Sequence, residues 1–294
     1  MTALTKVETP TRPSAESALG VTNLLRHLRD SSRGLKTAFS ERADFRSVET
    51  YCGFLGHGRS GHSLIGALIN AHPQAVISHE LHALRYLMYP LPRNVLYGLI
   101  VDRDRWFSAQ GERWSGYNYQ VENQWQGRWE TLKVIGDKKG GQTTALLTDR
   151  PQVLERLRKT VRVPVRFIWV IRNPYDNIAT KYLRPIKRSP EQWTELYFRN
   201  LRTAERLVAE DLDSDEVHIF RIEDFMRSPR EGIKEMCDFL NLDASPEFVE
   251  ACGSKVFSTP SRTRDKIDWE PHVLERVQEG IEQSSYLKGY TFED

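Results

Sequence analysis

A short apolar stretch followed by a glycine-rich loop constrains the fold of this chain more than any other feature. Residues 51–56 (Tyr-Cys-Gly-Phe-Leu-Gly) have the pattern of a buried strand, residues 56–63 (Gly-His-Gly-Arg-Ser-Gly-His-Ser) form the loop, and an apolar helix is expected from Leu64. The glycines let the loop wrap closely, so backbone N–H groups and the helix N-terminus converge on an anion. The order of strand, loop and helix predicts a phosphate site on an α/β sheet.

The loop departs from that of nucleotide triphosphatases at one position. Its spacing from Gly56 to Ser63 matches G-x-x-x-x-G-K-[ST], but His62 stands where the lysine is expected. The apolar strand expected at residues 166–171 ends in Arg172, not in an acidic residue that could hold magnesium. A P-loop kinase or NTPase is therefore disfavoured and is kept as an alternative function.

Apolar runs alternate with helical patterns from residue 51 onward, which is the rhythm of βαβ units. The expected strands are Tyr51–Leu55, Ala75–Ile77, Leu132–Ile135, Arg166–Ile171 and Val217–Phe220. The expected helices are Leu64–Ala71, Val153–Thr160, Pro174–Leu183, Glu191–Ala209, Glu231–Leu240 and Val273–Gln283. These elements predict an α/β fold of the P-loop type, a three-layer α/β/α sandwich around a central, mostly parallel sheet.

The chain is expected to divide into a short N-terminal part and one long domain. Residues 1–45 are interpreted as a polar tail and a helical lead-in outside the core, and residues 46–294 as a single domain. Ten of the 30 aromatic residues fall within an insertion at about 86–130. This insertion forms either a satellite hydrophobic cluster or an aromatic wall on the acceptor side.

Composition and charge exclude several classes of protein. The 42 basic and 40 acidic residues leave a net charge of +2, so no nucleic-acid footprint is present. No segment approaches the roughly 20 apolar residues of a membrane span, and the N-terminal stretch lacks the apolar region of a secretory signal, which predicts a cytoplasmic protein. Three scattered cysteines support neither a disulfide framework nor a metal site. The sequence gives no indication of oligomeric state.

A second anion motif follows the strand expected at residues 166–171. Arg172 stands at the carboxyl end of this strand, and Asn173 and Pro174 are residue types that start a helix. Thr180 lies about two helical turns later, where its hydroxyl could join the Arg172 guanidinium on a phosphate. Ligands of open α/β sheets bind at the carboxyl edge, so we expect both motifs to meet there.

In this order the motifs resemble the PAPS-dependent sulfotransferases. The resemblance rests on residues 58–64, on Ala-His-Pro at 71–73, and on Arg-Asn-Pro at 172–174 with a hydroxyl eight residues after the arginine. It extends over about residues 51–290 and is closest in motif style to bacterial, carbohydrate-type and tyrosylprotein sulfotransferases. It implies transfer of a sulfuryl group from 3′-phosphoadenosine 5′-phosphosulfate (PAPS), with PAP as product and no metal. The implied acceptor is a hydroxyl-bearing small molecule, glycan, lipid or polyketide.

The resemblance also implies roles for individual residues. The 5′ end of the nucleotide is expected at Arg59, Ser60, Gly61, His62, Ser63 and Leu64, and the 3′-phosphate at Arg172 and Thr180. Arg59 and His62 are also expected to act in the transfer, although the family usually has threonine where this chain has His62. Lys138 corresponds to a lysine that contacts the sulfuryl group, with Lys139 as a substitute. The segment bearing Ser261, Arg262 and Arg264 resembles a loop that closes over the nucleotide; otherwise it is a solvated charge run.

A candidate general base follows the second expected strand, within residues 77–82 (Ile-Ser-His-Glu-Leu-His). By the resemblance Glu80 is the base, and His79 and His82 are the alternatives because a neutral imidazole accepts a proton near pH 7. The two histidines are three residues apart after a strand, which does not match the HExxH metal motif, so no metal is expected. A catalytically silent PAP-binding protein of the same fold is the remaining alternative function.

Overall fold

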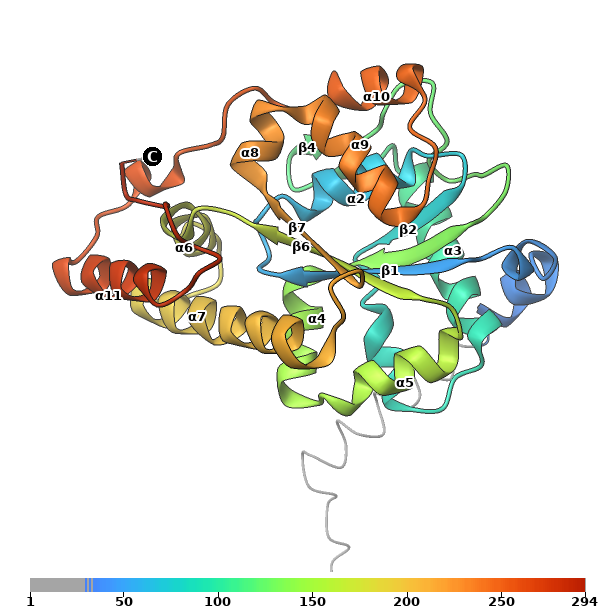
Figure 1. Cartoon of the computed structure of the whole chain (residues 1–294), viewed down its shortest axis with the longest axis horizontal. Helices are drawn as coiled ribbons and strands as arrows, with labels where there is room; N and C mark the ends of the chain where they lie inside the picture. Colours follow the sequence, from blue (N-terminus) through green and yellow to red (C-terminus); the bar gives the residue numbers. More distant parts are fainter. Residues whose placement is uncertain (1–29, 31, 33, 294) are drawn as a thin grey trace, which may run out of the picture.

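The centre of the molecule is a five-stranded sheet in which every neighbouring pair of strands is parallel (Figure 1). The computed structural model describes residues 30, 32 and 34–293. The strands follow the order β2-β5-β1-β6-β7, with bounds Thr50–Gly56 (β1), Ala75–His79 (β2), Val134–Lys138 (β5), Val165–Ile171 (β6) and Val217–Arg221 (β7). This sheet confirms the predicted α/β fold with a parallel centre.

Alternation of side chains along the central strand separates the core into two layers. Tyr51 and Leu55 of β1 belong to one buried apolar cluster, whereas Cys52 and Phe54 belong to the other. Successive residues of a strand point to opposite faces of the sheet. A continuous apolar run is therefore what a strand covered on both faces requires.

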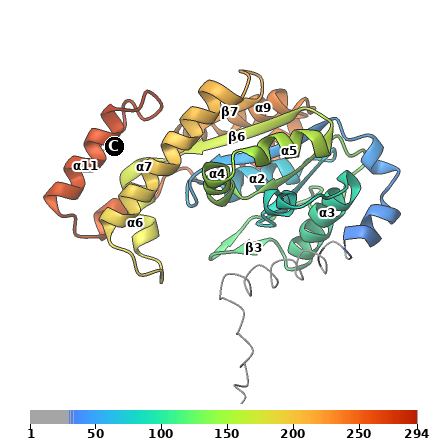
Figure 2. The same ribbon diagram turned by 90° about the horizontal axis from the view of Figure 1, so that it is seen from below.

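Helices cover both faces of the sheet (Figures 1 and 2). On the face of Cys52 lie α2 (His62–Asn70), α8 (Ile222–Arg227), α9 (Pro229–Leu240) and α10 (Pro246–Gly253). On the face of Tyr51 lie α4 (Gly140–Asp149), α5 (Gln152–Val161) and α7 (Pro190–Arg206), with α11 (Pro271–Glu282) packed on α7. Helix α3 (Arg93–Ala109) packs against β2, and α6 (Pro174–Tyr182) follows β6.

Several elements differ from the sequence prediction. The strand expected at Leu132–Ile135 is shifted and extends to Lys138, because pairing with β1 and β2 overrides the low strand propensity of Gly-Asp-Lys. Helix α4 was not expected, since it begins with two glycines. Within the aromatic insertion the chain forms α3 and a hairpin, β3 (Arg113–Trp114) and β4 (Tyr117–Asn118).

The N-terminal lead-in contributes to the core, contrary to the prediction. Residues 34–40 are helical, and Ala38 is buried in the same cluster as Tyr51. A Cβ on Gly98 of α3 would lie 2.2 Å from the carbonyl oxygen of Gly34, so the two backbones are in close contact. The predicted polar tail lies outside the described residues. Within the described part of the chain, no helix is long and apolar enough to cross a membrane.

Candidate active site

The glycine-rich loop connects β1 to the N-terminus of α2. Gly61 caps this helix with a φ of 101°, a left-handed conformation that glycine adopts without steric cost. N–H groups in the first turn of a helix lack acceptors within the helix and attract anions. The N–H of Leu64 instead donates to the Gly61 carbonyl oxygen at 2.9 Å, so the amides of residues 61–63 are the candidates for an anion-binding end.

Two side chains of the loop have structural partners. The Ser60 hydroxyl is buried and accepts a hydrogen bond from Asn177 Nδ2 at 2.9 Å, and Asn177 Nδ2 also donates to the Gly58 carbonyl oxygen at 3.1 Å. Asn177, on α6, thereby fixes the loop against the helix that follows Arg172. Asn177 was not predicted from the sequence. Its signal was its place one helical turn after the capping Asn173, on a buried face.

The imidazole of His62 contacts the backbone of β1, whereas the sequence predicted a contact with the nucleotide. Its Nε2 lies 2.7 Å from the Leu55 carbonyl oxygen, and burial lowers the pKa of His62 to about 4, so the ring is neutral. A Cβ on Gly140 would lie 2.6 Å from this ring, and glycine there makes room for it. The side chain therefore braces β1 against α4, and only the backbone of His62 stands at the anion-binding end.

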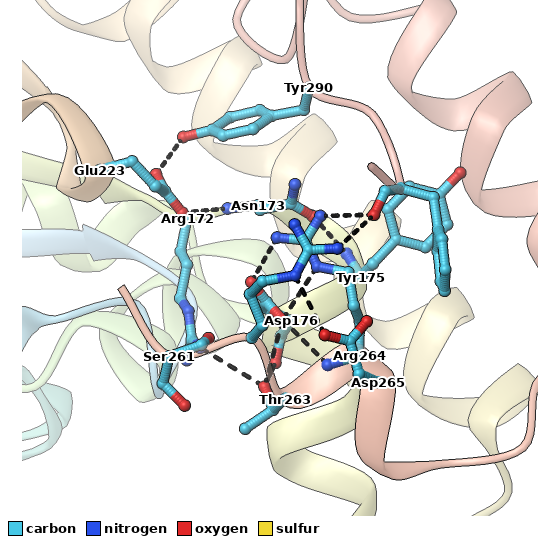
Figure 3. A network of polar contacts seen from close by, with 12 residues as sticks. Arg172, Asn173, Tyr175, Asp176, Glu223, Ser261, Thr263, Arg264, Asp265 and Tyr290 are labelled. Carbon is cyan, nitrogen blue, oxygen red and sulfur yellow. Dashed lines mark hydrogen bonds and ion pairs between the residues drawn. The ribbon is translucent and has the colours of Figure 1, made fainter. Parts of the chain in front are cut away.

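Arg172 and Thr180 are brought together as predicted by their spacing. Arg172 Nη1 donates to Thr180 Oγ1 at 3.2 Å and to the Arg59 carbonyl oxygen at 3.1 Å. Nη2 donates to the Ser261 carbonyl oxygen at 2.7 Å, and Figure 3 shows Arg172 beside Ser261. One guanidinium thus connects the glycine-rich loop, α6 and the C-terminal loop.

The two arginines of the C-terminal loop take other positions than expected. Arg264 is 3% exposed and forms an ion pair with Asp176 of α6 at 2.5 Å, which anchors the loop (Figure 3). Arg262 is exposed and pairs with Asp265 at 3.0 Å. Neither arginine lines the cavity described next, whereas Ser261 does. The anchoring carboxylate, Asp176, was not predicted.

A cavity of about 700 Å³, here called the first cavity, extends between the two anion motifs. Its lining includes five cationic residues and, among the described residues that form it, no acidic one; the cations are Arg59, Arg172, Arg184, Lys255 and Lys266. Tyr117 and Tyr119 from the aromatic insertion also line it, together with apolar side chains such as Ile222 and Phe257. A cationic cavity with apolar walls suits an anion that carries a flat ring.

Lys138 connects the glycine-rich loop to Glu80. Its Nζ donates to Ser63 Oγ at 2.9 Å and to Glu80 Oε1 at 2.7 Å. Lys139 Nζ contacts the other carboxylate oxygen of Glu80. A Cβ on Gly66 would lie 2.8 Å from Lys138 Cγ, so glycine in α2 leaves room for the lysine stem. Burial lowers the pKa of Lys138 to about 7.

The segment that carries Glu80 is held in an unusual conformation. Glu80 and His82 have φ values of 60° and 62°, in the left-handed region that non-glycine residues seldom adopt and that recurs at functional sites. The buried Asp137 carboxylate accepts hydrogen bonds from the N–H groups of Leu81 at 3.0 Å and Ala83 at 2.8 Å. Asp137, which precedes Lys138 in β5, therefore positions the Glu80 segment, a role the sequence did not reveal.

The two histidines proposed as alternative bases are both neutral but differ in access. His79 stacks on Phe107 with ring centroids 4.0 Å apart, and burial lowers its pKa to about 2. His79 lines neither of the cavities described here. Burial lowers the pKa of His82 to about 4, and His82 lines a second cavity together with Glu80.

This second cavity has a volume of about 420 Å³. Its lining residues are Asp30, Glu80, Leu81, His82, Arg85, Tyr86, Leu99, Asp102, Arg103, Trp106, Lys139 and Gln142.

The aromatic residues of the insertion do not form a single wall. Tyr97 and Phe107 enter the core, Tyr117 and Tyr119 line the first cavity, and Trp106 lines the second. Among the described residues, no three His, Cys, Asp or Glu side chains are grouped to hold a metal ion.

A family model matches most of this chain. A sequence model described as the sulfotransferase family matches residues 54–246, which is 193 of the 294 residues. The sulfotransferase domain from the curacin biosynthetic pathway has a similar structure, with a TM-score of 0.50, 14% identity, and coverage of 80% of this chain and 96% of that one. This likeness shows the fold alone.

Two further solved structures are similar. The sulfotransferase domain from the Synechococcus PCC 7002 olefin synthase has a TM-score of 0.48 and 15% identity, covering 81% of this chain and 94% of that one. A sulfotransferase from Alicyclobacillus acidocaldarius has a TM-score of 0.45 and 16% identity, covering 82% and 94%. Among curated proteins, none matches this sequence significantly.

Proposed function

Because the chain belongs to the sulfotransferase family, we propose that it transfers a sulfuryl group from PAPS to a hydroxyl-bearing acceptor. The observation that carries this proposal is the position of Lys138. Its Nζ is within hydrogen-bond distance of both Ser63, in the anion-binding loop, and Glu80, the candidate base. A cation at this point faces the place where a donor and an acceptor would meet.

The first cavity suits the doubly phosphorylated donor. The 5′ end would lie at the amides of residues 61–63, and the 3′-phosphate would lie at Arg172 and Thr180, whose side chains are 3.2 Å apart. The positive charge of Arg172 beside a hydroxyl group suits a phosphate, which is a strong hydrogen-bond acceptor, and this favours the assignment. Five cationic side chains in the lining add attraction for a highly charged anion.

The proposed reaction is an in-line displacement at sulfur. Glu80 takes the proton of the acceptor hydroxyl, the acceptor oxygen forms a bond to sulfur, and the bond from sulfur to the 5′-phosphate oxygen breaks to release PAP. Negative charge then grows on the leaving phosphate, where the Lys138 ammonium and the loop amides stabilise it. The Glu80 carboxylate contacts both Lys138 Nζ and Lys139 Nζ, which hold it at this point.

Binding calorimetry tests the donor assignment. We expect PAP to bind to the wild-type protein at least about tenfold more tightly than AMP, because a charged hydrogen bond to the 3′-phosphate contributes roughly 1.5–3 kcal/mol. Equal affinities for PAP and AMP would contradict the 3′-site. Tight PAP binding without sulfated product from any acceptor would support the alternative of a catalytically silent PAP-binding protein, and magnesium-dependent ATP turnover would support a kinase or NTPase.

A further inference from the structure

The second cavity lies on the other side of the Lys138–Glu80 contact from the first. Ser63 lines the first cavity, Glu80 lines the second, and Lys138 Nζ is 2.9 Å from one and 2.7 Å from the other. An in-line displacement requires the nucleophile and the leaving group on opposite sides of the sulfur. The second cavity is therefore where an acceptor hydroxyl can reach Glu80 while the nucleotide fills the first.

Charged side chains of both signs line this cavity. Three of the described lining residues are acidic and three are basic; the acids are Asp30, Glu80 and Asp102, and the bases are Arg85, Arg103 and Lys139. Their formal charges therefore cancel. Tyr86, His82 and Gln142 add polar groups, and only two of the twelve lining residues, Leu81 and Leu99, are aliphatic.

One helix supplies much of this lining. Leu99, Asp102, Arg103 and Trp106 of α3 follow the spacing i, i+3, i+4 and i+7, which places them on one face of the helix. The Arg103 guanidinium lies 4.3 Å from the Trp106 ring centroid and donates through Nε to the His79 carbonyl oxygen at 2.6 Å. Arg103 is thereby held at the end of β2, while the Trp106 indole remains 46% exposed.

We propose that the second cavity is the acceptor site and that the acceptor is an uncharged polyol, such as a sugar. A hydroxyl group both donates and accepts hydrogen bonds, so a ring with several hydroxyls can satisfy carboxylates and guanidiniums at the same time. The volume of about 420 Å³ is within the range of small-molecule sites. This inference rests on the proposed function, because it names the substrate class of that reaction.

Other acceptor classes fit this lining poorly. An aliphatic alcohol, a polyketide or a steroid would displace water from six charged side chains without replacing its hydrogen bonds, and loss of the water bound to a charged group is unfavourable. An anionic acceptor would meet three carboxylates, and a cationic one would meet three basic groups. A neutral molecule with many hydroxyls avoids both conflicts.

An acceptor panel with ³⁵S-labelled PAPS tests the proposal. The panel contains maltose, sucrose and myo-inositol as polyols, 2-naphthol as a phenol, and 1-decanol as an aliphatic alcohol. We expect label to be transferred to at least one polyol with a higher kcat/KM than to 2-naphthol or 1-decanol. Transfer to the phenol or the aliphatic alcohol alone, or to no member of the panel, overturns the polyol assignment.

Two substitutions test whether the acceptor binds in the second cavity. Trp106→Ala and Gln142→Ala should each raise the KM for the polyol, by about 2- to 10-fold for the lost indole contact, with unchanged PAP affinity. Phe39→Ala, an exposed aromatic outside both cavities, is the control and should change neither value. An unchanged polyol KM in both cavity variants overturns the site.

Calorimetry on the same preparations separates failure of this inference from failure of the proposed function. If PAP does not bind, the proposed function fails and the acceptor site fails with it. If PAP binds and label reaches 2-naphthol alone, only the inference fails.

Discussion

The two cavities on either side of Lys138 differ in both charge and origin. The first is lined by five cations without an acidic partner among its described lining residues, whereas the second balances three acids with three bases. The first therefore attracts anions at long range, and the second can select a neutral molecule only through short-range hydrogen bonds. Lys138 contacts Ser63, which lines the first cavity, and Glu80, which lines the second. This contrast predicts that a substitution in the first cavity will change nucleotide binding alone. A substitution in the second cavity should change only the reaction with the acceptor.

The largest effect is expected from Glu80, on the side of the second cavity. Glu80→Gln keeps the shape of the side chain but removes the carboxylate that accepts a proton. We expect kcat to fall by about 10² or more with little change in PAP affinity. The measurement is initial-rate kinetics with labelled PAPS and the best acceptor of the panel.

Glu155→Gln is the matched control for this variant, because Glu155 is an exposed carboxylate on α5. Unchanged turnover in Glu80→Gln would remove Glu80 from the mechanism. Loss of PAP binding in the same variant would show that Glu80 also affects the first cavity.

Arg172→Ala tests the first cavity in the same way. Loss of the charged hydrogen bonds to the 3′-phosphate should weaken PAP binding by about 1.5–3 kcal/mol, which is roughly 10- to 150-fold, and leave AMP binding nearly unchanged. Calorimetry with both nucleotides measures the difference. Arg276→Ala, which removes an exposed arginine of α11, is the control. An equal loss for PAP and AMP would show that Arg172 acts through the loop and not through the 3′-phosphate.

Deprotonation of Lys138 should make kcat/KM depend on pH. Burial lowers its pKa to about 7, so the ammonium loses its proton as the pH rises through 7. Because the charged form stabilises the leaving phosphate, kcat/KM should fall above pH 7, by about tenfold per pH unit for a single deprotonation. Lys138→Arg keeps its charge and should abolish this falling limb, whatever its absolute rate. A limb of the same position and slope in Lys138→Arg would assign it to another group.

The smallest effect concerns stability and lies on the far side of α3 from its cavity-lining residues. Burial raises the pKa of Asp104 to about 8, and Asp104 Oδ1 accepts from Asn70 Nδ2 at 2.6 Å. Between about pH 4 and 8 the folded protein holds this proton while the unfolded chain has lost it. Stability should therefore decrease as the pH rises through this window.

Asp104→Asn should reduce this slope without changing PAP affinity, measured by urea unfolding at pH 5, 6.5 and 8. Part of the slope should persist, because burial also raises the pKa of Glu112 to about 7. Asp215→Asn, at an exposed carboxyl, should leave the slope as in the wild type. A wild-type slope in Asp104→Asn would mean that Asp104 is ionised in the fold.

Sequence patterns sufficed for the sheet because its strands are apolar on both faces. The run at residues 166–171 and the strand before the glycine-rich loop needed no tertiary information. The end of β5 was missed because Asp137 and Lys138 are unfavourable in isolated strands and are stabilised here by neighbouring strands and by buried partners. Helix α4 was missed for a similar reason, since its two glycines are tolerated where they contact His62 and Gly58 closely.

Key residues of the first cavity could be predicted from the sequence more easily than those of the second. Two contiguous motifs supply part of the first cavity, so Arg172 and the glycine-rich loop could be identified from spacing. The anchors Asp176 and Asn177 escaped because their partners, Arg264 and Ser60, are distant in sequence. The second cavity draws on α3, α4, the segment after β2 and Asp30, and only tertiary packing brings these together. The polar stripe on α3 was the signal that could have indicated it.

A crystal structure of the protein with PAP tests the central claim most directly, namely that donor and acceptor meet at Lys138. The predicted result places the 3′-phosphate on Arg172 and Thr180 and the 5′-phosphate at the amides of residues 61–63, with Lys138 Nζ beside it and the second cavity still open at Glu80. A nucleotide in the second cavity, or a 5′-phosphate directed away from Lys138, would contradict it.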